Sequence, residues 1–353
     1  MIITRTPFRV TLGGGGTDLP SYYEKNGGFI FAMGINHYMY LTLHQSNVDR
    51  RVVIQYSKTE VTDHVKDVKH ELAREALLRH GVEAAVTIAS QADLPAQTGM
   101  GSSSSYLVGL LAALHAYRRD HVPVQALAEE ACDIELNVLK KGIGKQDQYM
   151  AAFGGLTVLE IARDGKVKVE SLRLPGWVYA DFLANTHIYF IGNARSAESI
   201  LSTQNQAMMQ PGTEAHRQTS DRLNQIKELG YRILEAVREG RLDDFGLMLD
   251  EHWQAKKRLS SKISLPQIDR LYDEVRREFG VLGGKIIGAG GGGCLMLYCP
   301  KNHHKLVQYM EARRMPRLDY GVAFEGAKVV ADLYASKNMS LSHKFDSENV
   351  TRL

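Results

Sequence analysis

The sequence has little of what marks membrane, secreted or nucleic-acid-binding proteins. It contains no run of eighteen apolar residues, so no segment is predicted to cross a membrane as a helix. Only three cysteines are present and none forms a CxxC pair, which argues against a disulfide framework and against structural zinc. The 43 basic and 40 acidic residues nearly cancel to +3, which excludes a strong electrostatic attraction to nucleic acid or anionic membranes.

Two further absences bear on where the protein acts and on how it could bind ATP. Residues 1–12 lack the cationic segment and long apolar core of a secretory signal, which together with the unpaired cysteines favours a cytoplasmic protein. The pattern GxxxxGK followed by Ser or Thr is missing, so the chain is not predicted to be a P-loop ATPase. What is present is an ordinary globular composition, 44% hydrophobic and 24% charged over 353 residues, which predicts two domains.

Periodicity and turn residues predict a mixture of strands and helices. Strands are expected within 2–12, 29–43, 51–56, 86–90 and 187–192, with a hairpin at Asp164-Gly165 and a strand–glycine–strand segment at 285–299. Helices are expected at 71–81, from 102 to about 119, at 124–141 and at about 215–240, 241–259 and 266–280. Residues 202–213 lack clear periodicity and are predicted to form a mobile loop. We expect domains at 1–182 and 183–338, and a polar tail at 339–353.

The segment from Asp93 to Ser105 carries the strongest chemical signal. It places Gly99, Gly101 and then four consecutive serines directly before a predicted helix. The first turn of a helix has unpaired N–H groups and a partial positive charge, and glycines let the backbone wrap a phosphate chain. A single serine would be explained as a helix cap, but only one of the four can be the cap. The segment therefore predicts a phosphate-binding loop with a hydroxyl ligand for Mg²⁺.

A second glycine run, Gly288 to Gly293, formally satisfies GxGxxG. In a dinucleotide-binding fold these glycines would open a helix, but here a predicted strand follows them, which disfavours a dehydrogenase. We expect the run either to pack its backbone closely against the phosphate loop or to form a tight turn.

Two carboxylates stand out. Glu135 lies at the edge of the apolar stripe of the 124–141 helix rather than on its solvated face. Asp147 follows in a segment interpreted as a loop, between Gln146 and Gln148. For either residue alone, a structural salt bridge is as reasonable as a catalytic role, so their interest lies in the combination.

Three segments, Pro7 to Asp18, Pro95 to Ser105 and Gly288 to Gly293, occur in the order of the three motifs of the GHMP kinases. The middle one, PxxxGMGSSSS, is the specific motif, and the resemblance covers residues 1–335. It implies an α+β fold with a ribosomal-protein-S5-like N-terminal domain and a ferredoxin-like C-terminal domain, and an ATP- and Mg²⁺-dependent kinase. The segments GKQDQYMAAFGGL and HWQAKKRLSSKIS further resemble the bacterial D-glycero-D-manno-heptose 7-phosphate kinases, which phosphorylate the anomeric O1 on the route to GDP-heptose.

Carried over by position, the resemblance implies a role for each motif residue. Asp147 falls on the catalytic aspartate and Arg9 on its neighbouring arginine, while Glu135 and Ser103, with Ser102 as a close alternative, fall on the Mg²⁺ ligands. The nucleotide is expected at Pro95, Gly99, Met100, Gly101, Ser102, Ser103, Ser104 and Ser105, and the sugar at Gly14, Gly15, Gly16, Thr17, Asp18, Gly290 and Gly291.

A heptose 7-phosphate would also need a cationic grip on its distal phosphate. Arg195, in a glycine-preceded segment with serines beside it, is the first choice. Lys256-Lys257 and Lys262 are alternatives, although a solvated helix face explains any single lysine equally well.

The acceptor itself stays open. Galactokinases carry Glu-His before their Thr-Asp, whereas this chain has Gly15-Gly16, and the extra room favours a larger sugar such as a heptose. Some fucose kinases share the glycine-rich form. Three functions therefore remain: a sugar-phosphate 1-kinase, a GHMP kinase for another metabolite such as fucose or a hexose, and a non-catalytic sugar sensor. The expected partners are a small-molecule sugar phosphate and a second copy of the chain, with neither nucleic acid nor membrane.

Overall fold

Two β-sheets organise the computed structural model, which describes residues 1–46, 48–192 and 197–334. The larger sheet has the order β12-β1-β2-β5-β3-β4, with β6 pairing with both β2 and β7. Its strands are β1 (Ile2–Gly13), β2 (Gly28–Gln45), β3 (Val52–Gln55), β4 (Thr59–Thr62), β5 (Val86–Ala92), β6 (Leu156–Ile161), β7 (Val167–Leu172) and β12 (Lys328–Asp332). The smaller sheet has the order β11-β8-β10-β9, formed by β8 (Thr186–Gly192), β9 (Gly283–Ile286), β10 (Gly293–Tyr298) and β11 (Arg317–Leu318).

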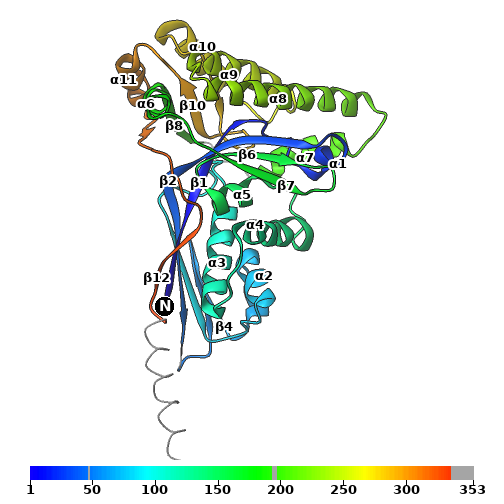
Figure 1. The fold of residues 1–353 in the computed structure, drawn as a ribbon, viewed down its shortest axis with the longest axis vertical. Helices are drawn as coiled ribbons and strands as arrows, with labels where there is room; N and C mark the ends of the chain where they lie inside the picture. The colour runs from blue at the N-terminus through cyan, green and yellow to red at the C-terminus, as the bar shows by residue number, and fades with distance from the viewer. Residues whose placement is uncertain (47, 193–196, 335–353) are drawn as a thin grey trace, which may run out of the picture.

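Helices cover both sheets. Figure 1 shows α2 to α5 beside the long strands of the larger sheet, and α8 to α10 layered at the opposite end of the molecule. The helices are α1 (Pro20–Asn26), α2 (Glu71–Arg79), α3 (Ser102–Arg118), α4 (Val124–Cys132), α5 (Gln146–Phe153), α6 (Gly176–Asn185), α7 (Ala197–Met208), α8 (Glu214–Arg238), α9 (Leu242–Lys257), α10 (Pro266–Phe279) and α11 (His303–Ala312), with a 3-10 turn at Val65–Asp67 and a π-helix at Asp133–Val138. The mixture confirms the predicted α+β class.

The burial of β1 explains how the site is positioned. Its first residues alternate between buried and half-buried, and from Thr6 to Gly13 every residue is buried. The change occurs because α3 and α5 contact β1 within the first layer, while α8 also contacts it from the smaller-sheet side. A strand covered on both faces reads as a continuous buried run rather than as an alternation. The end of β1 therefore lies at the junction of the two helical layers.

Several predicted elements are confirmed. The hairpin at Asp164-Gly165 joins β6 to β7, and residues 285–299 form a strand, a glycine run and a strand. The helix predicted at 124–141 is also present, as α4 followed by the π-helix that ends at Val138. Two other predictions were wrong. Residues 202–208 continue α7, which contacts α8 and α1, and Asp147 lies in the first turn of α5 rather than in a loop.

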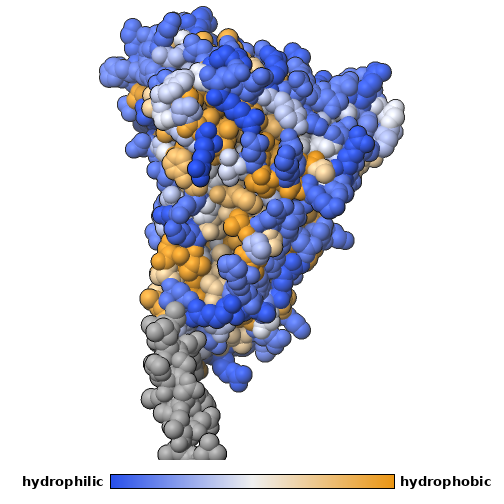
Figure 2. Space-filling view, in the orientation of Figure 1, coloured by the Kyte–Doolittle hydropathy of each residue, from blue (hydrophilic) through white to orange (hydrophobic). Residues whose placement is uncertain are grey.

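The chain crosses between the sheets near its end. Strand β12 pairs antiparallel with β1, so residues 328–332 join the larger sheet although they fall within the interval predicted for the second domain. The boundaries 1–182, 183–338 and 339–353 stay predictions. None of the described helices is long and apolar enough to cross a membrane. Figure 2, in the orientation of Figure 1, shows mostly hydrophilic residues on the face of the molecule toward the viewer, with apolar residues gathered along its middle.

Candidate active site

Arg9 and Asp147 form the centre of the candidate site. Arg9 comes from the buried half of β1, and its Nε and Nη2 atoms donate to Oδ1 of Asp147 at 2.8 and 2.6 Å. Nη1 donates to the carbonyl of Gly99 at 2.5 Å, and the backbone N–H of Arg9 donates to the carbonyl of Met100 at 3.1 Å. These bonds tie the end of β1 and the segment 95–105 to α5. Because both contacts to the carboxylate go to Oδ1, Arg9 leaves Oδ2 of Asp147 to other partners.

The loop before α3 has the shape expected of a phosphate-binding turn. Gly101 caps the helix in the left-handed region, with φ of 79°, which favours glycine. A Cβ atom there would lie 3.3 Å from the carboxylate carbon of Asp147, so a larger residue would press on the candidate catalytic group. The loop therefore places the first N–H groups of α3 next to Asp147.

The four serines divide into two pairs. Ser102 and Ser103 are partly or fully exposed, whereas Ser104 and Ser105 are buried. The hydroxyl of Ser104 donates to Glu135 at 2.6 Å, and that of Ser105 donates to the carbonyl of Pro7 at 2.9 Å. The expectation that all four bind the nucleotide is therefore corrected for these two hydroxyls, which the protein itself uses. Nearby, Pro95 is exposed and Met100 is buried.

The glycine run after β9 packs directly on this loop. A Cβ atom on Gly288 would lie 2.4 Å from the carbonyl oxygen of Gly99, and one on Gly293 would lie 2.5 Å from that of Thr98. In the other direction, a Cβ atom on Gly99 would lie 2.5 Å from the carbonyl oxygen of Ile287. No side chain fits at these distances, so the predicted close backbone packing is confirmed. The run from Gly288 to Gly293 therefore supports the backbone of the loop before α3.

Glu135 is fully buried in the π-helix, a local widening that often occurs at functional sites. Its Oε2 atom accepts hydrogen bonds from Ser104 and Gln148, both at 2.6 Å. Among the described residues, Oε1 receives only a 3.5 Å contact from the hydroxyl of Ser103. Burial raises the pKa of Glu135, and its hydrogen bonds counter part of that rise. A carboxylate oxygen facing an exposed hydroxyl is a suitable oxygen pair for Mg²⁺.

On the other side of Asp147 lies a pocket lined by Thr11, Gly15, Gly16 and Asp18, among others. Asp18 is buried, and its oxygens accept bonds from the backbone N–H groups of Gly16 at 3.2 Å and Gln146 at 3.1 Å. Burial raises its pKa to about 6, an effect that these backbone bonds reduce.

Three basic side chains that the sequence analysis did not bring together line the same pocket: His252 and Lys256 from α9, and Lys285 from β9. Two signals could have found them. His252 and Lys256 are four residues apart, which places them on one face of a helix. Lys285 is the single charged residue within the apolar segment around β9. A lysine in a segment that is expected to be buried is unusual and can indicate a binding site. The neighbouring alternatives differ, because Lys257 pairs with Asp269 at 3.0 Å and Lys262 is exposed.

Comparisons with known proteins agree with this geometry. The family model for the GHMP kinases N terminal domain matches residues 63–155, and that for the GHMP kinases C terminal matches residues 233–313. The chain belongs to the GHMP kinases. It is therefore a kinase, a phosphotransferase with an alcohol group as acceptor, and it has the two-domain GHMP fold.

Individual relatives of this GHMP kinase carry several names. A D-glycero-alpha-D-manno-heptose 7-phosphate kinase from Campylobacter jejuni is 25% identical over 93% of this chain and 98% of its own. A Thermotoga maritima galactokinase is 22% identical, covering 83% and 88%. Among solved structures, a D-glycero-D-manno-heptose 1-phosphate kinase from Bacteroides thetaiotaomicron superposes with a TM-score of 0.74 at 21% identity, covering 94% and 100%.

Not all residues predicted for the sugar reach the pocket of this GHMP kinase. The hydroxyl of Thr17 contacts the carbonyls of Gly14 and Phe29, both at 2.8 Å, and so shapes the turn. The N–H of Gly291 donates to the carbonyl of Ile263 at 2.8 Å, and Gly290 packs against the same residue. These four predicted ligands, Gly14, Thr17, Gly290 and Gly291, therefore position the pocket walls instead of lining it. Arg195 lies outside the described residues.

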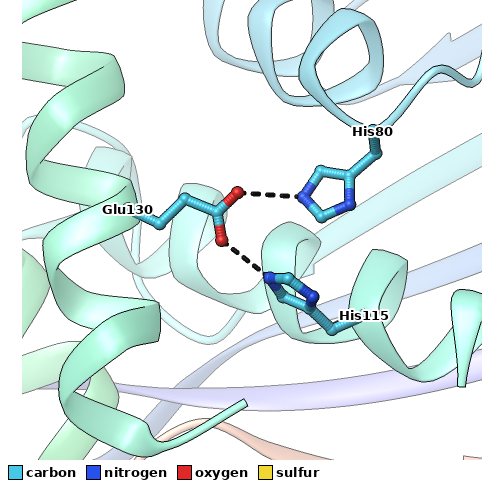
Figure 3. Close-up of side chains that lie close together, drawn as sticks. All are labelled: His80, His115 and Glu130. Carbon is cyan, nitrogen blue, oxygen red and sulfur yellow. Dashed lines mark hydrogen bonds and ion pairs between the residues drawn. The ribbon is translucent and has the colours of Figure 1, made fainter. Parts of the chain in front are cut away.

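A second cluster lies away from the pocket. Among the described residues, His80, His115 and Glu130 are the only histidine and acidic side chains placed closely enough to share a metal ion. Figure 3 shows Glu130 of α4 between the two rings, accepting from His80 at 3.1 Å and from His115 at 2.7 Å. His115 lies about 20 Å along α3 from Ser102, by the usual rise of a helix. Burial raises the pKa of Glu130, but the two histidine bonds outweigh burial and lower it overall.

Proposed function

We propose that this GHMP kinase transfers the γ-phosphoryl group of ATP to the anomeric O1 of a heptose 7-phosphate. The observation that carries the proposal is the Arg9–Asp147 pair, which lies between a glycine-lined loop at the start of α3 and a polar pocket. The relative from Campylobacter jejuni, which matches almost the whole chain, supports heptose 7-phosphate as the acceptor. A cytoplasmic location and a homodimer stay predictions from the sequence.

The nucleotide lies on the α3 side in this proposal. The N–H groups that follow Gly101, together with the hydroxyls of Ser102 and Ser103, bind the phosphates of ATP, because a helix N-terminus favours negative charge. Glu135 and Ser103 would hold Mg²⁺, which would neutralise charge on the phosphates. The buried hydrogen bonds from Ser104 and Gln148 fix the Glu135 carboxylate in place.

Asp147 acts on the acceptor. Its Oδ2 atom, which Arg9 does not bind, orients the attacking hydroxyl and accepts its proton, while Arg9 balances negative charge on the moving phosphoryl group. Phosphoryl transfer through a loose transition state depends mainly on alignment, so a rigidly held carboxylate is more important than a strongly basic one. Asp18 lies in the same pocket and holds a sugar hydroxyl.

A kinase for another sugar is the second candidate. Gly15 and Gly16 leave open the wall that would otherwise select galactose, and an L-fucokinase/L-fucose-1-P guanylyltransferase from Bacteroides fragilis is 25% identical over 83% of this chain. The non-catalytic sensor is disfavoured because the chain keeps Arg9 bound to Asp147 and keeps Glu135 beside the serines that begin α3.

A coupled assay of ADP release tests the function. Purified protein with ATP and Mg²⁺ is given hexoses, heptoses and their terminal phosphates, and the product is examined by NMR for phosphorylation at C1. We expect the highest kcat/KM with a heptose 7-phosphate and at least about 100-fold slower ADP release from the Asp147→Asn protein. Highest kcat/KM with an unphosphorylated hexose, or phosphorylation at another carbon, would contradict the proposal.

A further inference from the structure

The pocket contains more buried basic groups than its own acids neutralise. His252, Lys256 and Lys285 are 0%, 8% and 2% exposed. Besides burial, both lysines lower the pKa of His252, and Lys256 also lowers the pKa of Lys285. Burial is the main cause and lowers the pKa of Lys256 to about 7. Three such groups in one place are unusual, since lysines are seldom fully buried without a partner of opposite charge.

None of the three has an acidic partner among the described residues. Lys256 donates to the carbonyl of Gly288, and Lys285 donates to the carbonyl of Leu12 at 2.9 Å. Both ring nitrogens of His252 lack a hydrogen-bond partner in the part of the chain that the structure describes. Each lysine ammonium has three donors and uses one. Several buried donors are therefore left for a ligand.

The acids of the pocket do not supply that partner. Asp147 is bound to Arg9, and Asp18 is bound by amide N–H groups of Gly16 and Gln146. Asp18 is near enough to raise the pKa of Lys256, but no ion pair joins them. An external anion with several acceptor oxygens would satisfy the donors, and a phosphate is such an anion.

In the proposed function two phosphates reach the active site, one on the acceptor and one at the end of ATP. The lining of the pocket contains no residue of the predicted nucleotide loop at 95–105. Lys285 is tied to Leu12, shortly before Gly15 and Gly16, the glycines on the sugar side. Lys285 thus lies on the sugar side of the pocket, whereas Lys256 binds Gly288, whose backbone packs on Gly99 of the predicted nucleotide loop.

We propose that His252, Lys256 and Lys285 form a subsite for the phosphate that the sugar acceptor carries. The inference rests on the proposed function, because it assumes a phosphorylated acceptor. It makes the three side chains determinants of specificity: they remain incompletely satisfied until a sugar phosphate enters, and an unphosphorylated sugar cannot satisfy them.

Kinetics with two acceptors test the subsite. Lys256→Met and Lys285→Met are compared with wild type, using a heptose 7-phosphate and the same heptose without phosphate. We expect kcat/KM for the phosphorylated acceptor to fall roughly 10- to 100-fold, with KM for ATP and use of the free sugar nearly unchanged. The matched control is Lys257→Met, on the next residue of α9, which pairs with Asp269 outside the pocket and should behave as wild type.

Sulfate binding provides a readout without catalysis. Sulfate should raise the Tm of wild type and of Lys257→Met, because a ligand that binds only the folded state stabilises it, and should raise the Tm of the two pocket variants less. Equal Tm gains in all four proteins would overturn the subsite even if no acceptor were found.

The remaining outcomes separate the two proposals. If the pocket variants lose both acceptors equally and their KM for ATP rises, the basic groups bind the γ-phosphate, and the acceptor subsite is wrong. If wild type uses the free sugar as well as its phosphate, the subsite is wrong but the sugar kinase stands. If no sugar is phosphorylated while sulfate binding depends on Lys256 and Lys285, the proposed function fails and an anion site remains.

Discussion

The pocket lysines and the cluster of His80, His115 and Glu130 are two largely buried groups of basic side chains that differ in their hydrogen-bond partners. Around Glu130, two histidine rings each bind one carboxylate oxygen, so the rings have an acidic partner that links the end of α2, α3 and α4, although Nδ1 of each ring has no hydrogen-bond partner among the described residues. In the pocket, Lys256 and Lys285 bind only backbone carbonyls. A basic group that is bound to an acid of the protein stabilises the fold, whereas one bound only to backbone carbonyls can bind an external anion, at some cost in stability.

The largest expected effect belongs to the pocket side of this comparison. Asp147→Asn should lower kcat by about 10²- to 10⁴-fold, because the amide cannot accept the proton of the attacking hydroxyl. The KM for ATP and the unfolding free energy should change little, since the predicted nucleotide loop is untouched. Steady-state kinetics and urea unfolding measure both quantities, and near-normal turnover would remove Asp147 from catalysis.

The cluster should show the opposite pattern. Glu130→Ala leaves two largely buried histidine rings without their acceptor and should lower the unfolding free energy by about 1–3 kcal/mol, with kcat unchanged in the folded protein. Asp49→Ala, which breaks the exposed pair with Arg51, is the control and should lower the unfolding free energy much less, because solvent screens the pair. Comparable losses in the two variants would mean that Glu130 acts as an ordinary surface acid.

A third test uses the pH dependence of anion binding. Because Lys256 has a pKa of about 7, its charged fraction falls as pH rises, and sulfate should bind about tenfold more weakly at pH 8 than at pH 6. Arg9, His252 and Lys285 also face this group, and Asp18, with a pKa of about 6, adds to the effect when it ionises. Calorimetry with Lys256→Met should show a clearly smaller difference, and an unchanged one would exclude Lys256.

The smallest effect is expected from His252→Phe. The substitution removes two buried nitrogens that have no partner among the described residues, so the unfolding free energy should stay constant or rise by up to about 1 kcal/mol. Use of the phosphorylated acceptor should fall at the same time. Thermal unfolding and kcat/KM are measured on one preparation, and a clear loss of stability would mean that His252 stabilises the fold, as the cluster around Glu130 does.

The pH dependence of stability tests the direction of the pKa shift of Glu130. The pKa of Glu130 is lowered in the folded state, so its contribution to stability is present above its ordinary pKa of 4.5 and is lost as the pH falls below that value. Wild type and Glu130→Ala should therefore differ most above pH 4.5 and converge in stronger acid. Urea unfolding between pH 3 and pH 7 measures the difference, and a constant gap would contradict the assignment.

Local chemistry explains how much of the site could be predicted. Gly99, Gly101 and the serines before α3 were recognisable because a helix N-terminus and a left-handed turn have requirements that neighbouring residues meet by themselves. The resemblance to GHMP kinases added Arg9 and the pairing of Arg9 with Asp147. The two residues are far apart in sequence, and Nη2 of Arg9 lies 2.6 Å from Oδ1 of Asp147 in the structure. It could not assign the four serines, since their roles depend on which hydroxyls face Glu135 and Pro7.

By itself, the sequence determined the mixed α+β class, the three glycine segments in their order and the family that they indicate. The tertiary structure decided which side chains those segments enclose. Lys256 and Lys257 are adjacent and chemically identical, yet one is buried beside Gly288 and the other pairs with Asp269 at the surface. That difference depends on the rotation of α9 against β9 and on packing between residues distant in sequence, and such contacts leave no local pattern in the chain.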